Sequence, residues 1–179
     1  MLTIVYGQKS LISQHNNSCR PEMKSLVVYY SRTGNAKFIA EKIVANIDAD
    51  AEEIMDLKKR SGPIGFLSGG KDATQGKETK IGETKLSPKD YNLIIIGTPV
   101  WSSSPTPAIR TYINHNDLSG KKVAIFLTTT KQSQKALEKT KALLSNSQLI
   151  GELMLEEPLN KKEEAEKSII EWCKTLTSS

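Results

Sequence analysis

The most constraining feature of the sequence is a short apolar run that turns directly into an amphipathic helix pattern, within residues 26–48. The run LVVYY, residues 26–30, ends in the polar stretch SRTGN, residues 31–35. Apolar residues then recur at steps of three and four, the spacing of one helix face. They are Ala36, Ile39, Ala40, Ile43, Val44 and Ile47. A strand leading straight into a helix leaves unpaired N–H groups at the helix start, and these bind anions, phosphate above all.

Four further strand patterns follow, and helix patterns alternate with them. The predicted strands are residues 51–57, 92–97, 122–127 and 149–155, and the predicted helices are about residues 64–74, 107–113, 136–144 and 161–176. A capping box of Asn160 and Glu163 is predicted to open the last helix. Residues 92–97 are apolar throughout, as in strands buried on both faces. The alternation predicts an α/β fold with a parallel sheet and helices on both faces.

Three predicted loops are candidates for a ligand site. They are residues 31–36, 98–105 and 128–133, which follow the first, third and fourth strands. In parallel sheets, ligands bind at the carboxyl ends of the strands where strand order reverses, so we expect these loops to meet. Ser31 and Thr33 offer hydroxyl donors, and Gly34 permits close approach of the backbone.

The first loop resembles the phosphate loop of the flavodoxin family, which has the form Ser/Thr-x-Thr-Gly-Asn-Thr. Five of the six positions are compatible, and Ala36 replaces the last hydroxyl, so one phosphate donor is lost. The second loop, with GTPVW at residues 97–101 and PTPAIR at residues 105–110, resembles the ring-binding segment of the flavodoxin-like oxidoreductase branch. The third loop departs from the family because three threonines stand where a glycine is common. The resemblance covers about residues 24–177.

The resemblance implies a five-stranded parallel sheet in the order 2-1-3-4-5 and FMN as the cofactor. Trp101 is expected to lie against the flavin, although a packed core or interface aromatic is the alternative. The implied cofactor-binding residues are Ser31, Arg32, Thr33, Gly34, Asn35, Ala36, Thr98, Pro99, Val100, Trp101, Ser102, Ser103, Thr128, Thr129 and Thr130.

The leading interpretation is an FMN-binding electron-transfer protein that exchanges electrons with redox partner proteins. The alternative is an enzyme, an FMN-dependent NAD(P)H oxidoreductase that reduces a quinone or a similar small acceptor. Phe66 and the glycine-rich residues 62–76 would then belong to a substrate site. A phospho-receiver is disfavoured because Gly97-Thr98 ends the third strand without an acidic residue. No metal-ligand cluster, phosphatase signature or nucleophile elbow occurs in the sequence.

Length and composition indicate one globular domain. The chain has 179 residues, is 37% hydrophobic and 25% charged, and carries a net charge of +5. The charges are interspersed, which argues against nucleic acid as a partner, and the apolar runs are too short for a membrane span. We expect a cytoplasmic monomer or homodimer. Residues 1–22 are expected to be an extension, disordered or due to an over-extended start site, and residues 23–179 the folded domain.

Two further features are expected to be structural. Residues 65–72, GFLSGGKD, nearly match the nucleotide P-loop, but Asp72 stands where a Ser or Thr must hold magnesium. The sequence therefore predicts a glycine-rich loop with a solvated lysine. Cys19 and Cys173 are far apart in the sequence, and Cys173 is expected to be a small core residue in the last helix.

Overall fold

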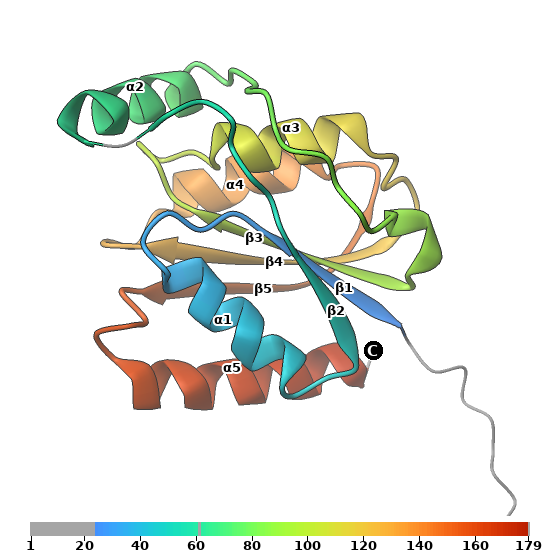
Figure 1. The fold of residues 1–179 in the computed structure, drawn as a ribbon. Coiled ribbons are helices and arrows are strands. Elements are labelled where there is room, and N and C mark those ends of the chain that lie inside the picture. Colours follow the sequence, from blue (N-terminus) through green and yellow to red (C-terminus); the bar gives the residue numbers. More distant parts are fainter. Residues whose placement is uncertain (1–23, 61, 179) are drawn as a thin grey trace, which may run out of the picture.

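The computed structural model describes residues 24–60 and 62–178 (Figure 1). Five parallel strands form one sheet in the order β2-β1-β3-β4-β5, which confirms the predicted fold class. The strands are β1 (Ser25–Tyr29), β2 (Ala49–Glu53), β3 (Leu93–Pro99), β4 (Lys122–Thr129) and β5 (Gln148–Glu156). The helices are α1 (Asn35–Val44), α2 (Gly62–Thr74), α3 (Pro107–His115), α4 (Gln134–Leu143), α5 (Lys162–Thr177) and the 3-10 turn η1 (Pro88–Asp90). The predicted extension, residues 1–22, lies outside the described residues.

Two hydrophobic cores lie on opposite faces of the sheet. Helices α1 and α5 cover one face, and α3 and α4 cover the other, with α2 beyond α3 (Figure 1). Along β1, Leu26 and Val28 belong to the core on the α3 and α4 side, whereas Val27 and Tyr29 belong to the core on the α1 and α5 side. Because both faces of the central strands are buried, their sequences are continuously apolar rather than alternating.

Two predicted boundaries were wrong. Helix α1 ends at Val44, which is 36% exposed instead of buried. Strand β2 covers Ala49–Glu53 instead of residues 51–57. The chain leaves the sheet after Ile54, and the Asp56 carboxylate accepts a hydrogen bond from Nε of Arg60. An isolated antiparallel bridge between Asp56 and Ile81 joins the segment that follows β2 to the segment that follows α2.

The capping box predicted for the last helix was also wrong. Helix α5 begins at Lys162, and its N-cap residue, Lys161, makes no side-chain cap. The side-chain amide of Asn160 instead donates to the Glu157 carboxylate, at 3.4 Å. Asn160 is therefore used by the loop before the helix.

Helix α2 confirms the helix predicted near residues 64–74, but its glycines have a role that the P-loop comparison missed. A Cβ on Gly65 would lie 2.3 Å from the carbonyl carbon of Arg60, and a Cβ on Gly69 would lie 2.9 Å from the Trp101 ring. The predicted glycine-rich loop is thus wrong: the segment is a helix, and glycines one turn apart let it approach its neighbours closely. Leu67 of this helix is 71% exposed.

Cys173 is buried in α5, as predicted, and burial raises the pKa of its thiol to about 11. Cys19 lies outside the described residues. Within residues 24–60 and 62–178, no helix has both the length and the apolar character that crossing a bilayer requires.

Candidate functional site

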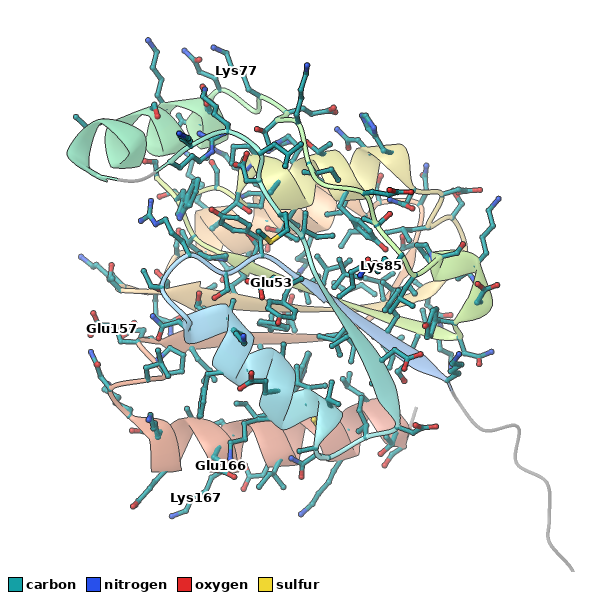
Figure 2. All side chains as sticks on the ribbon, in the orientation of Figure 1. Glu53, Lys77, Lys85, Glu157, Glu166 and Lys167 are labelled. Carbon is teal, nitrogen blue, oxygen red and sulfur yellow. The ribbon has the colours of Figure 1, made fainter. Side chains whose placement is uncertain are left out.

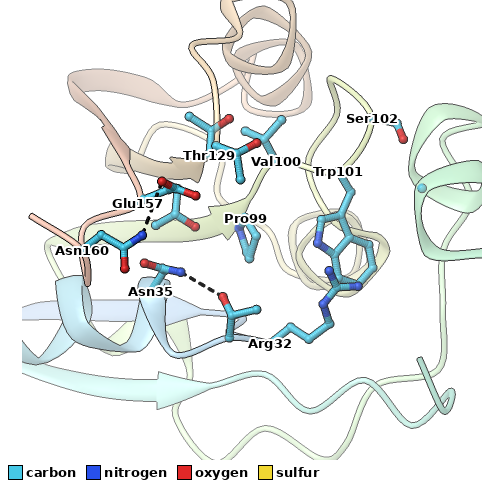
Figure 3. Close-up of a pocket in the computed structure, with 13 residues that line it drawn as sticks. Arg32, Asn35, Pro99, Val100, Trp101, Ser102, Thr129, Glu157 and Asn160 are labelled. Carbon is cyan, nitrogen blue, oxygen red and sulfur yellow. Dashed lines mark hydrogen bonds between the residues drawn. The ribbon is translucent and has the colours of Figure 1, made fainter. Parts of the chain in front are cut away.

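A cavity of about 410 Å³ opens at the carboxyl ends of β1, β3 and β4 (Figure 3). In this sheet order, β2 lies on one side of β1, and β3 lies on its other side. The order of the strands therefore reverses between β1 and β3, and parallel sheets bind ligands at such a point. The volume lies in the range of small-molecule sites. The lining residues are Arg32, Thr33, Asn35, Gly70, Pro99, Val100, Trp101, Ser102, Thr128, Thr129, Thr130, Glu157 and Asn160.

The first loop is arranged as an anion site at the start of α1. Gly34 is the N-cap residue with φ of 87°, a left-handed conformation that disfavours any other residue. The Ser31 hydroxyl accepts from the N–H of Lys37 at 3.2 Å, and the Thr33 hydroxyl accepts from the Asn35 amide at 3.0 Å. Each hydroxyl keeps its own proton to donate. The first-turn N–H groups of a helix have no intrahelical acceptor, so this end of the cavity suits a negative group.

The loop between β5 and α5 closes the same end of the cavity, and the sequence reasoning missed it. The N–H of Leu159 donates to Oδ1 of Asn35 at 3.2 Å, which ties this loop to the first loop. Glu157 has φ of 43° and donates its N–H to the carbonyl of Thr129 at 2.9 Å. A left-handed non-glycine residue costs about 1–2 kcal/mol. The available signal was topological, because the end of β5 lies at the same edge as the ends of β3 and β4.

The second loop is a tight turn after β3. The N–H of Trp101 donates to the carbonyl of Ser104 at 2.9 Å, and the N–H of Ser104 donates back at 3.1 Å. Ser102 and Ser103, between them, have φ of 48° and 54°, as in a type I′ turn without glycine. The hydroxyl of Thr98 is fully buried and accepts from a backbone N–H at the start of α3. Thr98 therefore supports the base of the loop.

Trp101 is both a wall of the cavity and a packed aromatic. Its side chain is buried, and the Tyr30 ring meets it edge-on with centroids 5.6 Å apart. The guanidinium carbon of Arg32 lies 4.7 Å from the Trp101 ring centroid, and Gly69 of α2 approaches the ring edge. Figure 3 shows Arg32 and Trp101 together at one side of the cavity.

The third loop joins the second loop to the end of β5. The carbonyl of Thr128 accepts the N–H of Val100 at 2.8 Å, and the carbonyl of Thr129 accepts the N–H of Glu157. The Thr129 hydroxyl is hydrogen-bonded within its own loop, to Lys131. Thr130 is exposed at the rim. This loop therefore presents threonine side chains and backbone to the cavity.

Most of the residues predicted for cofactor binding come together at this cavity. Those that line it are Arg32, Thr33, Asn35, Pro99, Val100, Trp101, Ser102, Thr128, Thr129 and Thr130. Those that do not are Ser31, Gly34, Ala36, Thr98 and Ser103. Ser31 and Gly34 shape the first loop, and Ala36 is fully buried in the core beneath it. The lining residues absent from the prediction are Gly70, Glu157 and Asn160.

A buried ionic network holds α2 against this side of the cavity. Arg60 donates to Asp56 and to Asp72, the latter at 3.0 Å, and Lys58 donates to Asp72 at 2.7 Å. The hydrogen bond from Lys58 lowers the pKa of Asp72 despite its burial. Burial alone would lower the pKa of Arg60, but the hydrogen bonds to Asp56 and Asp72 raise it. The guanidinium carbon of Arg60 lies 5.7 Å from the Trp101 ring centroid, so the ionic network lies next to the tryptophan that forms the cavity wall.

The sheet order and the loops at its carboxyl edge define a flavodoxin-like α/β protein. A family model described as Flavodoxin matches residues 71–176, more than half of the chain, so the protein belongs to the flavodoxin family. The matched range begins after the first loop, and the anion site therefore rests on its own sequence and geometry. Among curated proteins, no sequence matches the chain significantly.

Several solved structures share the fold. A flavoprotein of Lactobacillus acidophilus NCFM, crystallised in complex with FMN, is 26% identical, with a TM-score of 0.67 over 78% of this chain and 97% of that chain. The apo form of the flavoprotein from the same organism is 25% identical, with a TM-score of 0.58 over 77% and 95%. Oxidised flavodoxin 2 of Bacillus cereus is 20% identical, with a TM-score of 0.58 over 87% and 98%, which bears on the fold alone.

Proposed function

We propose that the protein binds FMN at this cavity and carries electrons between redox partner proteins. The observation that supports the proposal most strongly is the position of an anion-binding helix start and a tryptophan-lined wall on one cavity of about 410 Å³. FMN has the matching shape, with a phosphate at one end and an aromatic ring system at the other. Family membership and the FMN complex of the Lactobacillus flavoprotein point to the same cofactor.

The residues of the first loop fit a phosphate. The first-turn N–H groups of α1 and the Thr33 hydroxyl would donate to it, and Gly34 keeps the backbone accessible. The cavity lining also contains one cation, Arg32, and one exposed carboxylate, Glu157. Since Ala36 has no hydroxyl, the amides and Thr33 take a larger share of the phosphate hydrogen bonds.

The residues of the second and third loops fit a planar ring. Under this proposal, the flavin ring lies beside Trp101 and against the threonines at the end of β4. To stack fully on Trp101, the ring would replace part of the contact that Arg32 makes with the indole. The flavin supplies the redox chemistry, and the protein binds it, orients it and excludes water from it.

The partners are part of the same proposal: redox proteins, a cytoplasmic setting, a monomer or homodimer, and no role for nucleic acid or membrane. The alternative is an oxidoreductase that takes hydride from NAD(P)H and reduces a quinone or a similar acceptor. Phe66 was its candidate substrate-site residue, and the Phe66 side chain lies outside what the structure describes.

Anaerobic mixing of the FMN-loaded protein with NADH or NADPH separates the two functions. A carrier should keep its oxidised flavin spectrum over minutes and lose it only when a separate reductase is added. Rapid bleaching by the nicotinamide alone would contradict the carrier proposal and favour the enzyme.

A further inference from the structure

Much of the positive charge of the protein lies in one segment, residues 54–82, which we name the α2 lobe. It holds six basic residues against three acidic ones, a surplus of three out of the net +5 of the whole chain, in about a sixth of the length. The basic residues are Lys58, Lys59, Arg60, Lys71, Lys77 and Lys80.

The acidic residues of the lobe neutralise only part of its positive charge. Asp72 pairs with Lys58 at 2.7 Å and with Lys77 at 4.0 Å, whereas Lys59, Lys71 and Lys80 are exposed. The side chains of Asp56 and Asp72 are only 3% and 11% exposed, inside the network around Arg60. Glu78 accepts from Asn114 and pairs with His115 at 2.9 Å, on the side of α3. The exposed lysines therefore dominate the outside, and Figure 2 shows Lys77 at the top of the lobe, facing away from the sheet.

The lobe also carries exposed apolar side chains. Met55, Leu57 and Leu67 are 62%, 61% and 71% exposed. Met55 and Leu57 flank the inward-facing Asp56 in an extended segment, so they point outward together. Leu67 and Lys71 are four residues apart on α2 and share its outer face. Exposed apolar side chains on a charged surface are typical of a protein interface.

The lobe is also in direct contact with the cavity. Gly69 packs on Trp101, Gly70 lines the cavity, and the Thr74 hydroxyl donates to the carbonyl of Ser102 at 3.4 Å. A helix with its side chains is about 10 Å across. A protein seated on the outer face of α2 is therefore separated from the Trp101 wall by one helix.

We propose that the outer face of the α2 lobe is the docking site for an acidic redox protein, an inference that rests on the proposed FMN function. The lysines attract the partner, and Met55, Leu57 and Leu67 give it apolar contact. A reduced one-electron donor seated there is oxidised as the flavin is reduced. Two donor molecules supply the two electrons that one FMN accepts, with protons taken from solvent.

The test uses two variants with the same change in net charge. Lys59→Glu/Lys71→Glu/Lys80→Glu reverses three exposed lysines of the lobe. Lys89→Glu/Lys167→Glu/Lys174→Glu reverses three exposed lysines elsewhere. Figure 2 shows Lys167 on α5, at the opposite end of the molecule from Lys77. The probe is a reduced plant-type [2Fe–2S] ferredoxin, an acidic protein, mixed anaerobically with each FMN-loaded protein in a stopped-flow spectrometer.

Electrostatic docking on the lobe predicts that the second-order rate constant of flavin reduction falls with added salt. The lobe variant should lose about tenfold or more at low ionic strength, and the remote variant should stay within about twofold of the unchanged protein. Equal losses in both variants, or no salt dependence, would overturn the docking site. Preferential binding of phosphatidylserine vesicles, with unchanged ferredoxin rates in the lobe variant, would also overturn it.

The proposed function and the docking site can fail separately. An FMN titration of each variant reports the function, because a chain that takes up no FMN refutes it whatever the lobe does. Calorimetric binding of oxidised ferredoxin to the three FMN-free proteins then still reports the lobe. Affinity lost only in the lobe variant supports the docking site, and equal affinity contradicts it.

Discussion

Replacing Thr33 with valine tests the anion site with little disturbance of the fold. Thr33 is exposed, lines the cavity and has a hydroxyl that accepts from Asn35 at 3.0 Å. Valine keeps the shape and removes the hydroxyl, while water can replace the acceptor for the half-exposed Asn35. The free energy of unfolding should therefore change by less than about 0.5 kcal/mol.

The effect on FMN affinity should be much larger than the effect on stability. A hydrogen bond to a charged group contributes about 1.5–3 kcal/mol, and 1.4 kcal/mol is tenfold in affinity. We therefore expect Thr33→Val to raise the Kd for FMN by about 10- to 100-fold. Riboflavin has the same ring and no phosphate, so its Kd should not change. Both constants can be measured by the quenching of flavin fluorescence.

Thr130→Val is the matched control, because Thr130 lines the same cavity at the end of β4, away from the first loop. It should change the affinities for FMN and riboflavin by the same factor. If Thr33→Val also weakened the two flavins equally, or left both unchanged, the first loop would not hold the phosphate.

Three other changes test the surroundings of the site. Gly69→Ala puts a methyl group 2.9 Å from Trp101, so it should cost about 1–3 kcal/mol in chemical denaturation and shift the Trp101 fluorescence; an unchanged emission spectrum would contradict the packing. Asp72→Asn should cost about 3 kcal/mol at pH 7; because the pKa of Asp72 is lowered from 3.8, this difference should shrink as the pH falls below 4, and a constant difference would count against the ion pair. Cys173 should resist a thiol reagent at pH 8 until the protein unfolds, since burial raises its pKa to about 11 and keeps the thiol neutral; rapid labelling of the native protein would refute its burial.

The central strands and the first loop could be predicted because their signals are local. The apolar run of β3 follows from burial on both faces, and the sequence SRTGN predicts a turn, in which Gly34 has a left-handed conformation. These features depend on residues close together in the sequence. Periodicity and turn chemistry therefore identify them.

The missed features depend on how segments pack in three dimensions, which hydrophobic periodicity and cap motifs do not report. Glycines 65 and 69 look like loop residues until Arg60 and Trp101 are placed against them. Asn160 has the sequence of a helix cap, yet it pairs with Glu157, whose position is fixed by β4. Sequence patterns did not predict these contacts, because they depend on how α2 packs on Trp101 and how the backbone of β4 holds the loop after β5.

The central claim is that one cavity holds both the phosphate and the ring of FMN, and a titration of the FMN-free protein tests it most directly. We expect saturation at one FMN per chain, with a perturbed flavin absorption spectrum and quenched tryptophan emission from Trp101. A protein that stays colourless after FMN is added and the excess removed would contradict the account.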